Sequence, residues 1–535
     1  MKPIRIMLAM LAKLLINVCP FRIITPLVLI LNVCPALGAT YYISSTGNDN
    51  NTGTSQTAAW ATIGKVNSTS FAAGDTVQFE GGKTFKGPLQ FSSNDKGTAA
   101  SRLVITSFGS GRATIDGGDL HAIDCNGTDY LTIQNINVKG LGIKTGQQFG
   151  GTGVKIANGN FVIIDNVETS GFRWAGVEIN NCPDARITNV YAHDNGYAGI
   201  RGKRNLQRLY IGHCRANNNP GDRDLNDISG SGIEVYNASD ATIEYCEAGY
   251  NGGDQGGRRG NGPVGIWIAH SNTTTIQYCI AHHNTNPTGD GGGIDLDSES
   301  HHNIVQYNYC YENKNYGIQL WQWGGKSQWL EKNIIRYNIF DNVKKNLARS
   351  IWIGHNDDSA TGVRDNDFYN NLVINENPTI GCQGKKVYDL RFRNNIFITQ
   401  NGTSFVVGAG EDQNFVFQGN CYWARDGKFN IYKKYPSLEE WANATGQEKV
   451  NDKIVGLFAD PQITYWADAN EPRLTDPTKL AQMKVFRLLE NSPCIDKGLD
   501  LKTLFQIDPG KRDFFGHPIP AGLTFDIGAC EYLRQ

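Results

Sequence analysis

The chain has 535 residues, enough for one very large domain or for two to three ordinary ones. Glycine is abundant at 61 residues, methionine is scarce at 4, and charged residues make up only 19%. This composition is typical of many short strands joined by turns rather than of helices. The formal net charge of −2 lacks the basic excess of a nucleic-acid-binding protein, so we do not expect nucleic acid as a partner.

Residues 1–38 differ in composition from the rest of the chain. They hold a long apolar run that ends in small residues around Gly38, and their only charged side chains are Lys2, Arg5, Lys13 and Arg22. A basic start followed by an apolar stretch and small residues is typical of a secretory signal peptide. We therefore expect a secreted, periplasmic or cell-surface protein without membrane contact after cleavage; a retained anchor is the alternative.

One pattern recurs through most of the chain: a glycine, two apolar residues separated by one position, and a second apolar stretch that closes on an asparagine. Copies begin at Gly153, Gly176, Gly199, Gly232, Gly265, Gly293 and Gly317. Such repetition is typical of solenoids, in which each unit buries its apolar face only against its neighbours. No copy holds a segment long enough for a helix, so we expect two or three short parallel strands per coil.

Several residue columns should face the core if the copies stack in register. Alternate apolar residues of the glycine-led strand form the first column, as in Ile233 and Val235. A second column interchanges valine and cysteine, which indicates buried thiols rather than metal ligands, with an inter-coil disulfide as the alternative: Val190, Cys214, Cys246, Cys279, Asn308 and Asn338. The closing asparagines predict an amide ladder at a left-handed bend: Asn195, Asn219, Asn251, Asn284, Asn313 and Asn342.

With its opening segment 40–77 and its closing motifs 491–498 and 525–531, the chain resembles the right-handed parallel β-helix proteins of the pectate-lyase-like superfamily. The resemblance implies an all-β right-handed parallel β-helix over 39–423, followed by a mixed C-terminal cap region over 424–535. A short helix at 58–66 should cover the first coil, and helical pieces are expected at 437–444 and 477–489. Cys494 and Cys530 lie in the two closing motifs and form a candidate disulfide.

The same register predicts which side chains face outward from the glycine-led strands. The first outward column is Lys155, Glu178, Arg201, Glu234, Trp267, Asp295, Gln319 and Trp352. The second is Ala157, Asn180, Lys203, Tyr236, Ala269, Asp297, Trp321 and Gly354. Tryptophans beside carboxylates are typical of a sugar site, because flat rings stack on pyranoses. Insertions at 220–231, 252–263 and 285–292 precede these strands and should form a lip along the strip.

We interpret this strip as the groove of a monomeric enzyme that cleaves a polysaccharide by hydrolysis without a cofactor. Asp295 and Asp297 point the same way, about 6.5–7 Å apart along the strand, near the short end of the separation of an inverting carboxylate pair. Glu234, two coils away, is a further candidate acid or base. The expected substrate-binding residues are Arg201, Lys203, Tyr236, Trp267, His270, Gln319, Trp321 and Trp352; the two cations would bind an acidic group.

Two alternatives remain open because this superfamily hosts hydrolases, lyases, epimerases and adhesins. Asp295, Asp297 and Glu299 are a possible Ca²⁺ site for elimination on a uronate polysaccharide. Related lyases place a lysine base on the next coil, where this chain has Gln319. The other alternative is a non-catalytic β-helix that binds carbohydrate or a surface.

Overall fold

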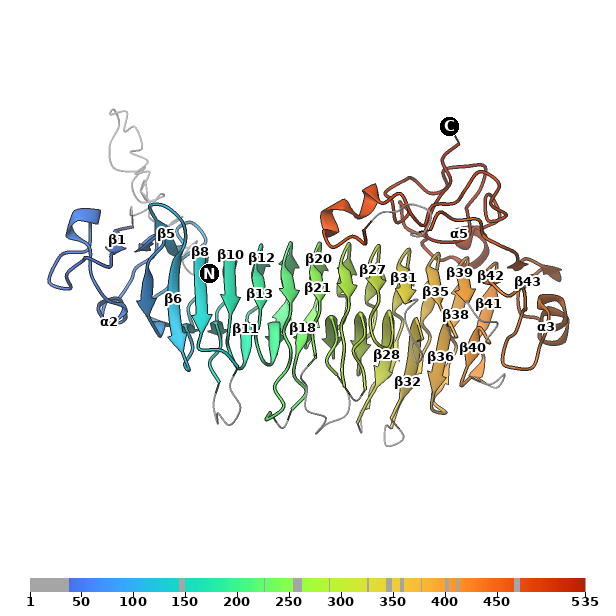
Figure 1. Ribbon diagram of the computed structural model, residues 1–535, viewed down its shortest axis with the longest axis horizontal. Helices are drawn as coiled ribbons and strands as arrows, with labels where there is room; N and C mark the ends of the chain where they lie inside the picture. Colours follow the sequence, from blue (N-terminus) through green and yellow to red (C-terminus); the bar gives the residue numbers. More distant parts are fainter. Residues whose placement is uncertain are drawn as a thin grey trace, which may run out of the picture. The chain divides into compact units, whose positions relative to one another are not determined.

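The computed structural model describes residues 38–534 except 144–149, 226, 254–261, 288, 325–326, 343–348, 357–359, 377, 400–403, 410–412 and 466–471. The expected signal peptide therefore lies outside the described residues, apart from Gly38. Within the described part, the helices are too short or too polar to cross a bilayer. The described chain winds into stacked parallel coils, each made of short strands joined by tight bends (Figure 1).

One face of the coils is a twelve-stranded parallel sheet in which each strand pairs with its equivalent in the next coil. Because consecutive members come from consecutive coils, this sheet carries the outward columns predicted above. Its strands are β4 (Leu89–Ser92), β7 (Ile123–Asn126), β9 (Val154–Ala157), β11 (Ala175–Asn180), β14 (Ala198–Lys203), β18 (Ser231–Tyr236), β22 (Ile266–Ala269), β25 (Ile294–Asp297), β28 (Ile318–Gln322), β32 (Ile351–His355), β36 (Ile380–Gln383) and β40 (Val406–Val407).

The other faces form a 26-stranded sheet among the described residues. Its strands are β1 (Thr40–Ile43), β2 (Thr76–Glu80), β3 (Thr84–Lys86), β5 (Leu103–Phe108), β6 (Ala113–Gly118), β8 (Leu131–Gly140), β10 (Ile163–Ser170), β12 (Arg186–Thr188), β13 (Tyr191–His193), β16 (Tyr210–Gly212), β17 (Arg215–Asn217), β20 (Thr242–Glu244), β21 (Glu247–Gly249), β23 (Thr275–Gln277), β24 (Ile280–His282), β26 (Ile304–Gln306), β27 (Tyr309–Tyr311), β30 (Ile334–Arg336), β31 (Ile339–Asn342), β34 (Asp367–Tyr369), β35 (Leu372–Asn375), β38 (Arg391–Arg393), β39 (Ile396–Thr399), β41 (Val416–Gln418), β42 (Cys421–Ala424) and β45 (Leu457–Phe458). Short sheets join β15 (Leu206–Gln207) to β19 (Ala238–Ser239), β29 (Leu330–Glu331) to β33 (Val363–Arg364) and β37 (Val387–Tyr388), and β43 (Lys449–Val450) to β44 (Lys453–Ile454).

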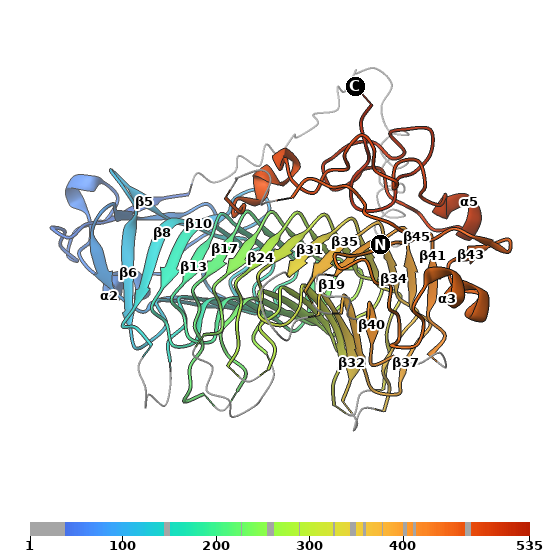
Figure 2. The ribbon, with the colours of Figure 1, turned by 45° about the vertical axis from the view of Figure 1, so that its right-hand side comes forward.

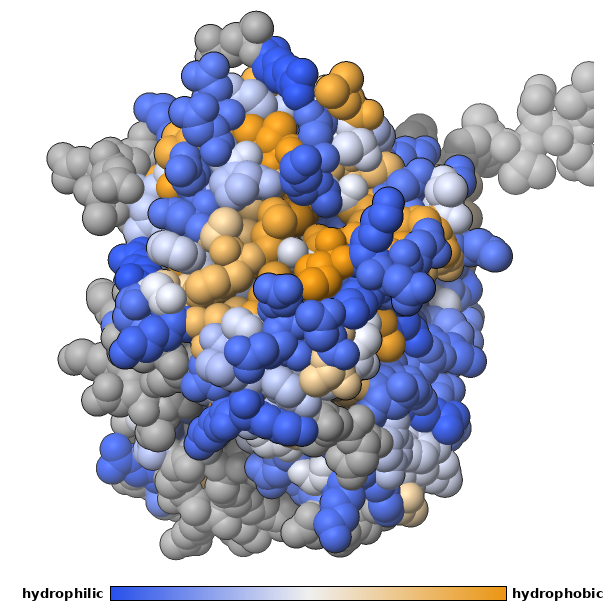
Figure 3. Space-filling model, turned by 90° about the vertical axis from the view of Figure 1, so that its right-hand side faces the viewer, coloured by the Kyte–Doolittle hydropathy of each residue, from blue (hydrophilic) through white to orange (hydrophobic). Residues whose placement is uncertain are grey.

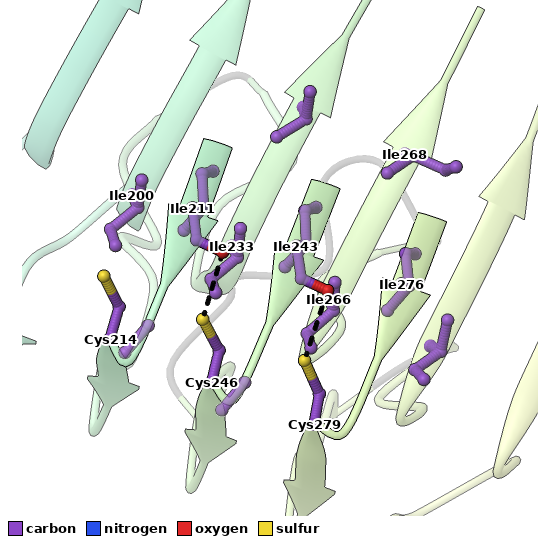
Figure 4. Close-up of a cluster of buried hydrophobic side chains, with 14 of the residues drawn as sticks. Ile200, Ile211, Cys214, Ile233, Ile243, Cys246, Ile266, Ile268, Ile276 and Cys279 are labelled. Carbon is purple, nitrogen blue, oxygen red and sulfur yellow. Dashed lines mark hydrogen bonds between the residues drawn. The ribbon is translucent and has the colours of Figure 1, made fainter. Parts of the chain in front are cut away.

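The core is made of the inward columns that the repeat predicts. Ile233 pairs with Ile266, Val235 pairs with Ile268, and all four side chains are fully buried. Figure 4 shows these isoleucines stacked from coil to coil beside the cysteine column. Stacking equivalent apolar side chains lets each coil bury the face that it cannot bury alone.

The cysteines of this column lie in the apolar core, as their interchange with valine predicts. Cys246 lies 3.8 Å from the Ile211 carbonyl oxygen and Cys279 lies 3.7 Å from that of Ile243 (Figure 4). All ten cysteines in the described residues are free and buried. The candidate disulfide between Cys494 and Cys530 is therefore wrong: the Cys494 thiol interacts with Cys421 of β42 instead, inside the core between the C-terminal segment and the coils.

Reductant should leave the thermal stability of the protein unchanged. Because the described cysteines are free thiols, no cross-link among them is available to break, whereas loss of a native disulfide costs about 2–5 kcal/mol. The measurement is the thermal unfolding midpoint with and without dithiothreitol. A midpoint that falls clearly in reductant would contradict the free-thiol arrangement.

An asparagine ladder links the closing bends from Asn195 to Asn313. The Asn251 amide nitrogen, for example, donates to the Asn284 side-chain oxygen over 2.9 Å. Two details differ from the prediction. The left-handed residue is the one before each asparagine, as in Tyr250 and His283, so that the amide itself stays turned inward. The ladder also ends at Asn313, because the Asn342 amide has no hydrogen-bond partner within the described residues.

The two ends of the solenoid are covered by short helices. At the first coil, helix α2 (Ile63–Asn67) follows the 3-10 turn η1 (Gln56–Ala58); a continuous helix over 58–66 is wrong because Thr62 caps α2 and forces it to start later. At the far end, α3 (Leu438–Thr445) confirms the helix expected at 437–444 and inserts Trp441 into the core. Figure 3 shows an apolar band between hydrophilic side chains at this end.

The C-terminal segment covers a side of the solenoid as well as its end. The described residues after 460, including η3 (Pro477–Gln482) and α5 (Leu501–Phe505), fold back over the outer face of strands such as β31 and β35 (Figure 2). Their apolar side chains form a second core with Tyr309, Ile339 and Leu372. Of the helical piece expected at 477–489, only the six residues of η3 are helical. This cover lies on the 26-stranded sheet and leaves the twelve-stranded sheet open.

Candidate functional site

The register of the twelve-stranded sheet confirms the outward columns. Glu234 pairs with Trp267, Trp267 with Asp295, Asp295 with Gln319, and Gln319 with Trp352. In the second column, Ala269 pairs with Asp297 and Asp297 with Trp321. The predicted carboxylates and aromatic residues therefore stand on neighbouring strands of one face.

The N-terminal half of this strip is a ladder of alternating charges. Arg201 donates to Glu234 over 3.0 Å and to Glu178 over 3.4 Å, and Lys203 lies 3.2 Å from Glu178. Glu178 also accepts a hydrogen bond from the Trp174 indole at 2.7 Å. Arg201 and Lys203, expected to bind an acidic group of the substrate, are thus paired with carboxylates of the protein itself, and neither lines the pocket described next.

A pocket of about 620 Å³ opens over the C-terminal half of the strip, from β18 to β36. All three predicted insertions contribute to it, through Asp227 and Ile228, through Gly262, and through Gly289 and Asp290, which confirms the lip. The remaining lining residues are Tyr236, Trp267, Asp297, Asn315, Tyr316, Gln319, Trp321, Trp323, Arg349, Trp352, Asn356 and Gln383.

Two tryptophans form the floor of the pocket because glycines on the next strand leave room for them. The rings of Trp321 and Trp352 stack at 5.8 Å between centroids with 18° between their planes. A Cβ atom at Gly354 would stand 2.5 Å from the Trp321 ring, and one at Gly381 would stand 2.7 Å from the Trp352 ring. The Trp321 indole donates to the Asn356 side chain over 2.9 Å, which fixes its orientation.

Trp267 and Tyr236 lie deeper than the open platforms that were predicted. Trp267 is only 4% exposed and packs with Val264 and Tyr316. Tyr236 packs against it at 5.3 Å between ring centroids. Trp267 therefore forms a wall of the pocket instead of an exposed surface.

Three carboxyl groups interact at the centre of the site: the buried Asp295 and Asp297, and the half-buried Asp290. Burial raises the pKa of Asp290 to about 6. Burial, with repulsion from Asp297 and Asp290, raises the pKa of Asp295 well above its usual range. Burial and the Asp290 charge also raise the pKa of Asp297, although the Ser298 backbone N–H and the indoles of Trp323 and Trp267 favour its carboxylate form. Within this carboxyl trio, ionisation of Asp290 therefore opposes ionisation of Asp295 and Asp297.

The three carboxyl groups differ in their access to the pocket. Asp290 and Asp297 line it, whereas Asp295 lies behind Tyr316 and Gln319. The Gln319 amide donates to Asp295 over 3.1 Å and the Tyr316 hydroxyl does so over 3.5 Å. Asp290 is held by the backbone N–H of Gly262 from the neighbouring insertion. The repeat analysis missed Asp290; the available signal was a carboxylate within an insertion assigned to the lip.

Glu234 and His270 lie beside the pocket without lining it. Glu234 is fully buried against Arg201, and burial raises its pKa to about 7. His270 lies 3.1 Å from a Glu299 carboxylate oxygen, while the other oxygen of Glu299 accepts backbone N–H groups of Ser327 and Gln328.

The suggested Ca²⁺ site is not assembled in this structure. Glu299 bonds to a histidine and to two backbone amides instead of turning toward Asp295 and Asp297. Among the described residues, no three histidine, cysteine, aspartate or glutamate side chains converge in a way that would hold a metal ion. These residues therefore do not fit the calcium ligand set, which requires six to eight oxygen donors.

Comparisons with known proteins agree with the solenoid architecture. The sequence profile of the family "Right handed beta helix region" matches residues 121–257, 152–338 and 224–372. A lacto-N-biosidase of Bifidobacterium longum subsp. longum is 21% identical over 609 aligned positions, which cover 92% of this chain. This chain spans only 36% of that relative's length.

Two solved structures that are similar to this chain are a lacto-N-biosidase and a pectate lyase. A lacto-N-biosidase from Eubacterium ramulus matches with a TM-score of 0.44 and 16% identity, over 74% of this chain and 68% of that chain. A pectate lyase matches with a TM-score of 0.46 and 15% identity, over 92% of this chain and 96% of that chain. The family profile and the strand pairing establish the chain as a right-handed parallel β-helix protein.

Proposed function

We propose that this protein is an exported glycoside hydrolase that cleaves a polysaccharide or oligosaccharide in the pocket over β22, β25, β28 and β32. The observation that carries the proposal is that Asp290 and Asp297 both line a pocket whose floor is formed by Trp321 and Trp352. Carboxyl groups supply acid and base for glycosidic cleavage, and flat indole rings bind sugar faces. The lacto-N-biosidase relative is itself a glycosidase by name.

The electrostatics assign different roles to the two carboxyl groups. Asp290, whose raised pKa is about 6, ionises first as the pH rises. Asp297 then feels the Asp290 charge, which together with burial keeps it protonated. In this mechanism Asp297 donates its proton to the leaving glycosidic oxygen as the bond to the anomeric carbon breaks. The Asp290 carboxylate takes a proton from the water whose oxygen forms the new bond to that carbon.

Asp295 acts as a positioning residue in this mechanism. Its carboxyl group is buried and hydrogen-bonded to Gln319 and Tyr316, and the charges of Asp297 and Asp290 raise its pKa. It does not line the pocket and does not contact the sugar. Gln319 and Tyr316 also line the pocket. A sugar that contacts them therefore contacts the same side chains that hydrogen-bond to Asp295.

The proposal is tested by incubating the protein with a panel of neutral and uronate-containing glycans while two signals are recorded, new reducing ends and the ultraviolet absorbance of unsaturated uronates. We expect reducing ends to appear without new absorbance, and EDTA to leave the rate unchanged, because the carboxyl pair requires no metal. Absorbance that rises with the reducing ends would contradict hydrolysis and favour a lyase. Absence of both signals over the whole panel would favour the non-catalytic binding alternative.

A further inference from the structure

A second feature of the pocket is a cation at its far end. Arg349 lines the pocket, and its guanidinium lies 4.3 Å from the centroid of the Trp352 ring. The side chain crosses the sheet over Gly381, where a Cβ atom would stand 2.1 Å from the Arg349 Cδ atom. The Arg349 backbone N–H donates to the Asn315 carbonyl over 2.9 Å. The guanidinium is therefore held in place by three features: the space left by Gly381, the Trp352 ring and the hydrogen bond of the Arg349 backbone.

Arg349 differs in its charge environment from the other cations on this face. Arg201, Lys203 and Lys155 each lie within 4 Å of a carboxylate of the protein. Within the described residues no carboxylate pairs with Arg349, and burial lowers its pKa, with only the Cys382 thiol opposing the shift. An arginine keeps its charge in a protein, and a partly buried guanidinium without an anion in reach is costly unless a ligand supplies one.

The distance along the sheet separates this cation from the carboxyl groups. Trp352 lies two strands beyond Asp295, through Gln319, or about 10 Å at the usual strand spacing. An anion beside Arg349 is thus held away from Asp290 and Asp297, and a sugar stacked on Trp352 lies in a different subsite from the sugar whose bond is cleaved.

We propose that Arg349 binds an anionic substituent, the carboxylate of a uronate or a sulfate ester, on the sugar that stacks on Trp352. This inference rests on the proposed function, since it names the class of glycan that the same pocket takes. A guanidinium presents two parallel N–H donors to such an oxyanion. The proposal thus assigns to Arg349 the binding of an acidic group, which the sequence had suggested for Arg201 and Lys203.

The test measures binding in the background of Asp297→Asn, so that cleavage does not interfere. Titration calorimetry compares oligogalacturonides with their carboxyl-reduced forms, and sulfated galactan oligosaccharides with their desulfated forms. We expect at least one charged probe to bind more tightly than its neutral partner. Adding Arg349→Gln should weaken binding of that charged probe by about tenfold or more, with the neutral partner nearly unaffected.

Two further variants make the outcome specific. Gly381→Ala keeps the guanidinium but displaces it, and should cause the same selective loss even if Arg349→Gln folds poorly. Arg364→Gln removes an equal charge on β33, where Arg364 pairs with Glu331 of β29 outside the pocket, and should leave the preference intact. The inference is overturned if neither charged probe is preferred, or if Arg349→Gln and Gly381→Ala weaken charged and neutral probes alike. Charge-selective binding without any cleavage would instead overturn only the proposed hydrolase, and cleavage with unchanged selectivity in Arg349→Gln would overturn only the Arg349 assignment.

Discussion

Replacing Asp297 with asparagine should lower the turnover number by about 100- to 10,000-fold, the usual contribution of a general acid. The amide has the shape of the carboxyl group but cannot donate a proton to the leaving oxygen. The Ser298 N–H, which donates to an Asp297 carboxyl oxygen over 2.9 Å, can still donate to the amide oxygen, so the fold and the glycan affinity should be retained. The measurement is initial rate on the best substrate of the panel, with circular dichroism and binding on the same samples.

Glu299→Gln is the matched control for this variant. Glu299 lies two residues further along the chain, but its carboxylate binds His270 and backbone amides outside the pocket. We expect nearly full activity from Glu299→Gln, since a glutamine oxygen can accept the same amide hydrogen bonds. Equal losses in the two variants, or full activity in Asp297→Asn, would be incompatible with Asp297 as the acid.

Asp290→Asn should cause a loss of similar size and should also change the pH profile. In the parent protein the group that must ionise is Asp290, whose pKa burial raises to about 6, so activity should increase as the pH rises through about 6. At higher pH the loss of the Asp297 proton should lower activity again, which gives a bell-shaped profile. An asparagine at position 290 cannot ionise, so the acidic limb should disappear with most of the activity.

The measurement is kcat/KM against pH for the parent and for Asp290→Asn. Asp240→Asn serves as the control, because this carboxylate accepts a hydrogen bond from Thr273 at an exposed turn and does not line the pocket. An unchanged acidic limb in Asp290→Asn would show that another group ionises there, and Glu234, with a pKa raised to about 7, would be the next candidate.

The strand register was predictable from the sequence because it depends on local alternation. A glycine-led strand such as Gly293 to Asp297 places Asp295 and Asp297 on the outer face wherever Ile294 and Leu296 face the core. The repeat then fixes which residue of the next coil lies beside each of them. The fold, the inward columns and the lip followed from the same reasoning.

The composition of the site itself was only partly predictable. Asp290 and Arg349 lie in segments between the coils, where no repeat fixes the direction of a side chain, and both were missed. The outward column had already placed Arg201 between Glu178 and Glu234, so its ion pairs with them at 3.4 Å and 3.0 Å were predictable from the register and were overlooked. Glu299 appeared to complete a metal site, since position alone does not show that its carboxylate binds His270 and the backbone of residues 327–328.

The most direct test of the account is a crystal structure of Asp297→Asn with an oligosaccharide substrate bound. The account predicts sugar rings stacked on Trp321 and Trp352, with the glycosidic oxygen of the cleaved bond next to position 297 and the anomeric carbon facing Asp290. Sugar bound on another face of the solenoid, or in the pocket with its glycosidic bonds away from both aspartates, would contradict it.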